Sequence, residues 1–235
     1  MKKLGFIFVI VLAVVSLLLA GCGGGDEEAS PTATKSPGAT VTETPGESVP
    51  PTSTLPSGEL GDVMGKASTI DSVKYDMIMT GPGMPSMTTK VWLKQLANKM
   101  KTESTVEGET TIQIVDWAAE VMYLYMPSQN MAYRMDLAGA PESPLEGTEA
   151  IEDYDYTILG TETLDGKVCL VVEWASEGVT AKSWVWKDKG FPIRVEMVTS
   201  QGTTIIEYKN IDFSNIPNSE FELPPSVEIM EMPSY

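Results

Sequence analysis

Residues 155–212 read DYTILGTETLDGKVCLVVEWASEGVTAKSWVWKDKGFPIRVEMVTSQGTTIIEYKNID. Short runs of β-branched and aromatic residues alternate in this stretch with turn pairs, namely Asp165-Gly166, Glu177-Gly178, Lys189-Gly190 and Gln201-Gly202. Asp-Gly is a strong hairpin signal, and the regular spacing of the other pairs supports the same interpretation. The stretch therefore predicts a series of antiparallel strands near 155–163, 167–175, 179–187, 191–199 and 203–212.

Upstream of this stretch the same alternation continues. Val73, Tyr75, Met77 and Met79 are separated by residues of the opposite face, and further strands are predicted near 87–93, 99–106, 110–116, 121–127 and 131–136. Apolar residues at helical spacing predict an amphipathic helix over 59–69, and a capping-box pattern at Ser143 predicts a second short helix to about residue 151. The expected fold class is mainly β (α+β), a curved meander sheet wrapped over one or two helices.

The N-terminus carries an export signal. A basic start, Met1-Lys2-Lys3, precedes an almost wholly apolar segment that ends at Ala20. This arrangement is typical of a signal peptide, and the segment is at the short end for a spanning helix, which needs roughly 20 apolar residues. Leu19-Ala20-Gly21-Cys22 resembles the bacterial lipobox, which implies cleavage after residue 21 and lipid attachment at Cys22. An uncleaved anchor helix is the alternative, and it would also export and tether the domain.

Composition divides the rest of the chain in two. Residues 23–58 are rich in Gly, Pro, Ser, Thr, Glu and Ala, so they cannot bury enough apolar surface to offset chain entropy. The predicted organisation is a lipoprotein signal peptide at 1–21, a lipidated cysteine with a disordered linker at 22–58, and one β domain at 59–235.

Charge and residue content exclude several classes of function. The chain has 33 acidic and 16 basic residues, a net charge of −17, which should repel nucleic acid and anionic headgroups. It has no histidine, so Ser-His-Asp triads, Cys-His pairs and imidazole zinc sites are impossible. Cys169 lies in an apolar run and is expected to be a buried, inert thiol. The acidic residues at 152–155 are interpreted as a solvated turn rather than a calcium site. We therefore expect no enzyme, no catalytic residue, no metal and no cofactor.

Two motifs resemble a known family. Residues 184–194, WVWKDKGFPIR, are similar to the W-x-D-x-x-x-P-x-R hairpin of the outer-membrane lipoprotein carrier (LolA/LolB-like) superfamily, and residues 216–224, IPNSEFELP, resemble its closing I-P-x-x-x-F-x-x-P signature. The resemblance implies an unclosed antiparallel β-barrel with helices in its concave face and an apolar cavity between them. Relatives bind acyl chains of lipoproteins or other lipids, and some act in envelope-stress sensing. The chain shows no clear counterpart of the soluble carrier's arginine latch, so a tethered receptor, lipid-handling lipoprotein or sensor is expected rather than a shuttle.

Methionine and aromatic residues are the candidates for lining that cavity, because methionine is flexible and polarizable. Ordinary core packing is the alternative for each of them, since ligand pockets and cores share their composition. Residues 81–87 form an apolar hairpin tip, in which Met84 and Met87 are predicted at the cavity mouth or against a membrane; a plain turn is the alternative. The predicted cavity residues are Met77, Met79, Val91, Trp92, Met122, Tyr123, Tyr125, Met126, Trp184 and Trp186.

Three hypotheses of function follow. The leading one is a membrane-anchored extracytoplasmic lipoprotein that binds a lipid or acyl chain in an apolar cavity. The second is an envelope sensor or protein-interaction module with a filled core and another envelope protein as partner. The third is a methionine-rich surface protein that binds copper, because Met77-x-Met79 and Met84-x-x-Met87 have thioether spacings that suit Cu(I). In the leading hypothesis the partners are the hydrophobic ligand and the cell or outer membrane, reached through lipidated Cys22, and not nucleic acid.

Overall fold

The computed structural model describes residues 58–137, 155–176 and 178–232. The predicted signal peptide, Cys22, the predicted linker up to residue 57 and the second predicted helix near 143–151 lie outside these residues. No helix within the described ranges is long and apolar enough to cross a membrane.

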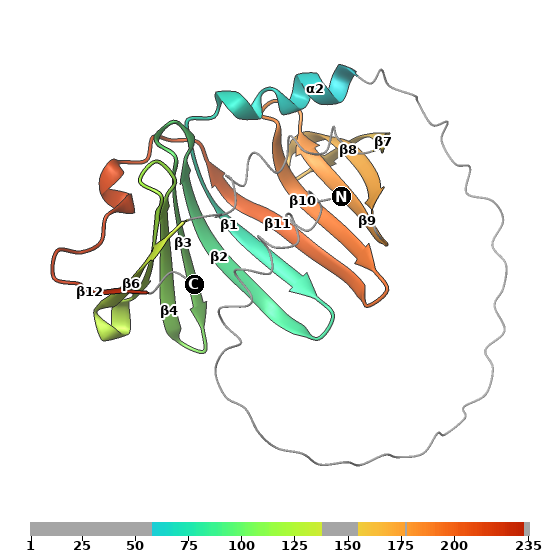
Figure 1. Cartoon of the computed structure of the whole chain (residues 1–235). Coiled ribbons are helices and arrows are strands. Elements are labelled where there is room, and N and C mark those ends of the chain that lie inside the picture. The colour runs from blue at the N-terminus through green and yellow to red at the C-terminus, as the bar shows by residue number, and fades with distance from the viewer. Residues whose placement is uncertain (1–57, 138–154, 177, 233–235) are drawn as a thin grey trace, which may run out of the picture. The chain divides into compact units, whose positions relative to one another are not determined.

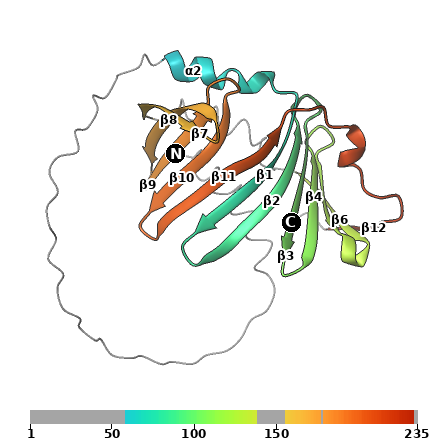
Figure 2. The same cartoon turned by 180° about the vertical axis from the view of Figure 1, so that it is seen from behind.

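One 12-stranded sheet dominates the domain (Figure 1; Figure 2). Its strand order is β12-β6-β5-β4-β3-β2-β1-β11-β10-β9-β8-β7, so β12 and β7 form two separate edges and the sheet is unclosed. All neighbouring strands pair antiparallel except β12 and β6, which are parallel. This architecture confirms the expected fold class. The strands are β1 Ser72–Gly81, β2 Met84–Lys94, β3 Lys99–Val106, β4 Glu109–Asp116, β5 Val121–Met126, β6 Met131–Asp136, β7 Tyr156–Leu164, β8 Lys167–Ser176, β9 Val179–Trp186, β10 Phe191–Thr199, β11 Gly202–Asp212 and β12 Glu228–Glu231.

The turn chemistry explains why the strands end where they do. Asp165 and Gly166 both have positive φ, 51° and 71°, as a two-residue type I′ hairpin requires. Glu107 and Gly108, at 52° and 86°, make a similar turn between β3 and β4. The strands predicted from the sequence are confirmed, whereas β12 was not predicted, because four residues at an edge give too short a pattern.

The helix predicted over 59–69 is present in two pieces. The α-helix α2 spans Gly58–Met64, and the 3-10 helix η1 spans Ala67–Thr69. The buried residues of α2 are Leu60, Val63 and Met64, which are the apolar positions of the predicted pattern. The remaining 3-10 helices are η2 Gln95–Ala97, η3 Pro127–Gln129 and η5 Asn218–Phe221.

α2 docks on the turn between β9 and β10. Lys187 Nζ lies 2.6 Å from Glu59 Oε1, and Lys66 Nζ donates to the Lys187 carbonyl oxygen at 2.6 Å. Gly190 has a φ of +67°, and a Cβ added to it would collide with the Val63 carbonyl oxygen and the η1 backbone. The W-x-D-x-x-x-P-x-R hairpin therefore owes its glycine both to backbone conformation and to the closeness of the helix.

A C-terminal strap, which we define as residues 213–232, covers part of the sheet. Ile216 and Phe221 pack on Ile114 of β4, and the three side chains are at most 5% exposed. Lys94 Nζ donates to the Ile216 carbonyl oxygen at 3.0 Å, and Lys101 Nζ lies 3.1 Å from Glu220 Oε2. The I-P-x-x-x-F-x-x-P signature thus fastens the strap before it ends in β12 beside β6 (Figure 1).

Candidate ligand-binding face

Strand register divides the side chains of the sheet between two faces. Successive residues of a strand point to opposite faces, and directly paired residues of neighbouring strands share one. Starting from Met77, the pairings lead to a surface that carries most of the chain's 14 methionines, which we name the methionine face. Its methionines are Met77, Met79, Met87, Met100, Met122, Met126, Met131, Met135 and Met197.

Several of these methionines form direct cross-strand pairs. Met79 lies opposite Met87, and on β5 and β6 Met122 lies opposite Met135 and Met126 opposite Met131. Directly opposed side chains have Cβ atoms about 4.5–5.5 Å apart, so the thioethers of each pair form a local apolar patch. Unbranched thioether side chains can change rotamer to fit different apolar shapes.

A short polar row crosses the same face on β2, β3 and β4. The Thr89 and Ser104 hydroxyl oxygens lie 2.9 Å apart, and Thr102 pairs with Gln113 on the next strand. Thr89 and Thr102 are buried. A mostly apolar surface with a few placed polar groups has the composition of a small-molecule site.

Three aromatic rings, those of Tyr75, Phe191 and Tyr208, form a cluster on this side of the sheet. The Tyr75 ring lies 5.3 Å from that of Phe191 and 5.5 Å from that of Tyr208, measured between centroids. Burial raises the pKa of the Tyr208 phenol to about 12, and burial together with Tyr208 raises the pKa of Tyr75 well above its ordinary value. Both phenols are therefore neutral at physiological pH and add no charge to the face.

The predicted cavity residues do not all share one surface. Five of them, together with Met87 of the predicted mouth loop, lie on the methionine face: Met77, Met79, Val91, Met122 and Met126. Four others lie on the opposite face: Trp92, Tyr123, Tyr125 and Trp184. Trp186 pairs with Phe191 beside the register shift of β10, and its ring lies 5.9 Å from that of Phe213, so register assigns it to neither face. One contiguous cavity wall cannot contain both sets, because neighbouring positions of a strand point apart.

The residues of the second set have other contacts. Trp92 and Tyr123 pack against the strap residues Ile216 and Phe221. Trp184 is 6% exposed and its indole Nε1 donates to Glu162 Oε2 at 2.7 Å. These side chains stabilise the opposite face.

Sequence reasoning also missed members of the methionine face. Met100, Met131, Met135 and Met197 belong to it by register. The available signal was the two-residue alternation within 131–135, since Met131 and Met135 share a face when their strand is regular.

Cys169 and Met84 lie apart from this surface. Cys169 is a free thiol buried among Val171, Trp184 and Ile193, and burial raises its pKa. Its environment keeps the thiol protonated and unreactive. Met84 begins β2 at a hairpin tip and is 41% exposed.

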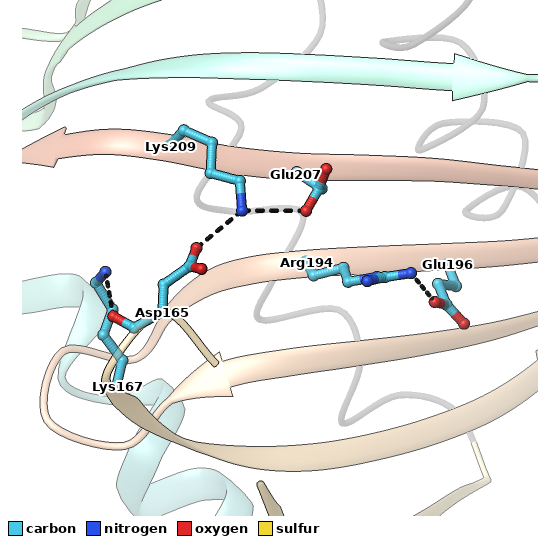
Figure 3. Close-up of polar contacts among 6 residues, drawn as sticks. All are labelled: Asp165, Lys167, Arg194, Glu196, Glu207 and Lys209. Atoms are coloured by element: carbon cyan, nitrogen blue, oxygen red, sulfur yellow. Dashed lines mark hydrogen bonds and ion pairs between the residues drawn. The ribbon is translucent and has the colours of Figure 1, made fainter. Parts of the chain in front are cut away.

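The opposite face of β9–β11 carries ion pairs (Figure 3). Asp165 Oδ2, from the β7–β8 turn, lies 2.9 Å from Lys209 Nζ on β11, and Lys209 also lies 3.1 Å from Glu207 Oε1. The hydrogen bond from Lys209 lowers the pKa of Asp165. On β10, Arg194 pairs with Glu196. Half-exposed pairs of this kind are typical of a solvated surface.

Comparison with known sequences does not assign the chain to a family. No protein-family model matches the chain. An uncharacterized protein of Methanocaldococcus jannaschii is 27% identical over 130 residues, which cover 51% of this chain and 37% of that protein. The match therefore spans little more than a third of the relative's length.

Comparison with solved structures shows the fold. An uncharacterized conserved protein from Thermus thermophilus has a TM-score of 0.55 at 12% identity, over 74% of this chain and 98% of that one. A chain of the Pseudomonas aeruginosa MucA/MucB complex has a TM-score of 0.50 at 11% identity, over 73% and 63%. The Mycobacterium tuberculosis lipoprotein LppX has a TM-score of 0.45 at 12% identity, over 68% and 95%. The first two likenesses show the fold alone: the chain shares with these structures one unclosed, mainly antiparallel sheet.

Proposed function

We propose that this chain is a non-enzymatic, extracytoplasmic lipoprotein that binds a lipid or acyl chain on its methionine face. The alignment of the methionines on one face by strand register carries the proposal. Half-buried methionines such as Met77, Met122 and Met126 keep apolar surface that an acyl chain could cover. Because the side chains are flexible, the face can follow acyl chains of different length and saturation.

Apolar burial supplies the binding energy in this proposal. Covering about 400 Å² of apolar surface would contribute about 10 kcal/mol, against association costs of about 4 kcal/mol or more. A lipid must therefore contact several strands of the face at once. Within the polar row, the half-buried Ser104 and Gln113 are the side chains that an ester or hydroxyl of the ligand could reach.

The anchor is part of the same proposal. Leu19-Ala20-Gly21-Cys22 supports lipid attachment at Cys22, and two acyl chains on that sulfur would hold the protein on its membrane. Residues 23–57 would then act as the tether. The absence of histidine from the sequence supports a binding role over acid–base catalysis at neutral pH.

Native mass spectrometry tests the binding. The chain with Cys22→Ala is exported, purified without detergent, and measured before and after incubation with a lipid extract. We expect an added mass of lipid size that organic extraction releases. A bare mass under both conditions would overturn lipid binding and favour the protein-interaction hypothesis.

A further inference from the structure

Two neighbouring hairpins have tips without charge. No charged residue occurs between Asp76 and Lys90, which includes the β1–β2 turn, or between Glu196 and Glu207, which includes the β10–β11 turn. Charged residues make up 21% of the whole chain. Both hairpin tips therefore present uncharged side chains only.

The two tips pack against each other. Thr80 of β1 pairs with Ile205 of β11, so the two turns lie at the same end of the sheet, side by side in both views (Figure 1; Figure 2). Gly202 has a φ of +127°, and a Cβ there would lie 2.5 Å from Pro82 Cγ. The tips therefore form one unit, with Pro82 seated on Gly202.

This tip unit, defined as residues 80–86 and 198–204, exposes apolar side chains. Pro82, Met84 and Pro85 are exposed, with Met84 at 41%, and Val198 is 48% exposed. Its remaining exposed residues are glycine, serine, threonine and glutamine. The unit thus combines proline, methionine and valine with small uncharged polar groups.

Other hairpins at this end of the sheet differ. The β3–β4 turn carries Glu107 and Glu109. The β5–β6 turn has no charge of its own, but Ser128 donates to Glu109 at 2.8 Å and Asn130 donates to the Ser226 carbonyl at 2.8 Å. That turn is held by polar contacts within the protein, whereas the tip unit presents its apolar side chains outward.

We propose that the tip unit docks on a lipid bilayer with uncharged or zwitterionic headgroups, placing Met84 and Val198 below the headgroup level. Apolar tips gain free energy from the acyl boundary, and the lack of charge removes the desolvation cost of entering it. The net charge of −17 disfavours an anionic surface. Met79 and Met87 of the methionine face lie directly above the tip, so docking brings that face to the bilayer.

The inference goes beyond the proposed function, because the tips can dock whether or not the methionine face holds a lipid. A depth measurement on the full chain tests it. An environment-sensitive fluorophore is attached at Met84→Cys, and the protein is added to phosphatidylcholine vesicles that contain spin-labelled lipids as quenchers. The control label is at Leu96→Cys, because Leu96 is 81% exposed in η2 at the opposite end of the sheet.

We expect quenching at position 84 that is at least about threefold stronger than at position 96, and weaker quenching with anionic vesicles. Equal quenching at both positions, or none at position 84, would overturn the proposal. In a variant that combines Met84→Glu with Val198→Glu, the lipid should quench a fluorophore at Ser86→Cys less strongly. The melting temperature should not fall, since both substituted side chains are exposed. Quenching at position 84 together with a bare native mass would retain the docking surface and reject lipid binding.

Discussion

The two faces of the sheet bury apolar residues in different ways. Beneath the strap, Ile114, Ile216 and Phe221 are at most 5% exposed and fit one another. On the methionine face, Val73 and Leu93 are also buried, but Met77, Met122 and Met126 are half-buried and unbranched. Branched and aromatic side chains suit a cover whose shape is fixed, whereas methionine suits one whose shape varies. The chain thus supplies a cover of fixed shape on one face, and under the proposed function the other face would adapt to its ligand.

The largest loss of stability is expected where the strap packs on the sheet. Phe221→Ala removes the ring that packs on Ile114, which should lower the free energy of unfolding by about 3–5 kcal/mol. Thermal unfolding should shift down by about 10 °C for a domain of this size. Ser219→Ala, at an exposed position of η5, is the matched control and should unfold like the wild type. A shift below about 2 °C for Phe221→Ala would show that the strap does not stabilise the sheet.

A substitution at Gly190 tests how much the docking of α2 on the β9–β10 turn contributes to stability. Gly190→Ala places a methyl group against the Val63 carbonyl oxygen and adds the strain of a positive φ, so we expect a loss of about 2–3 kcal/mol. Gly166→Ala is the matched control, because Gly166 also has a positive φ, +71°, but no atom lies within 4 Å of the added Cβ. Urea unfolding of both variants separates the cost of the contact with Val63 from the cost of the positive φ. Equal losses would mean that the contact between the added methyl group and the Val63 carbonyl oxygen costs nothing.

Much of the fold could be predicted from the sequence, but the two faces were confused. Turn pairs such as Asp165-Gly166 located the hairpins because backbone conformation is a local property. The predicted cavity residues were not separated by face: Met122 and Tyr123 are neighbours in sequence and point to opposite faces. Which face receives the strap depends on contacts between residues as distant as Lys94 and Ile216, and no local pattern encodes that pairing.

Substitutions on the methionine face should weaken lipid binding, whereas substitutions on the opposite face should not. Met122→Gln with Met126→Gln keeps side-chain length but makes the surface polar, so lipid affinity should fall by about tenfold or more. Tyr125→Gln, on the same strand and the opposite face, should leave affinity unchanged. Displacement of a fluorescent fatty acid measures both. A loss with Tyr125→Gln as large as that of the double variant would contradict the assignment of the faces.

The smallest effect is expected at the ion pairs on the opposite face. Asp165→Asn keeps a residue that tolerates the positive φ of 51°, so the variant isolates the charge. Asp165 is 41% exposed, and solvent screening limits the Asp165–Lys209 pair to less than about 1 kcal/mol. Because the folded pKa of Asp165 is lowered, its stabilisation is present above the ordinary aspartate pKa of about 4 and is lost as pH falls through the folded value.

Urea unfolding of the wild type and Asp165→Asn therefore should differ slightly at pH 7 and coincide at about pH 2, where both side chains are neutral. Added salt at pH 7 should narrow the difference, since the pair is exposed. A gap that persists at low pH would assign the effect to the shape of the β7–β8 turn instead of its charge. Set beside Phe221→Ala, the result would show that packed apolar contacts on the opposite face contribute several times more than its ion pairs.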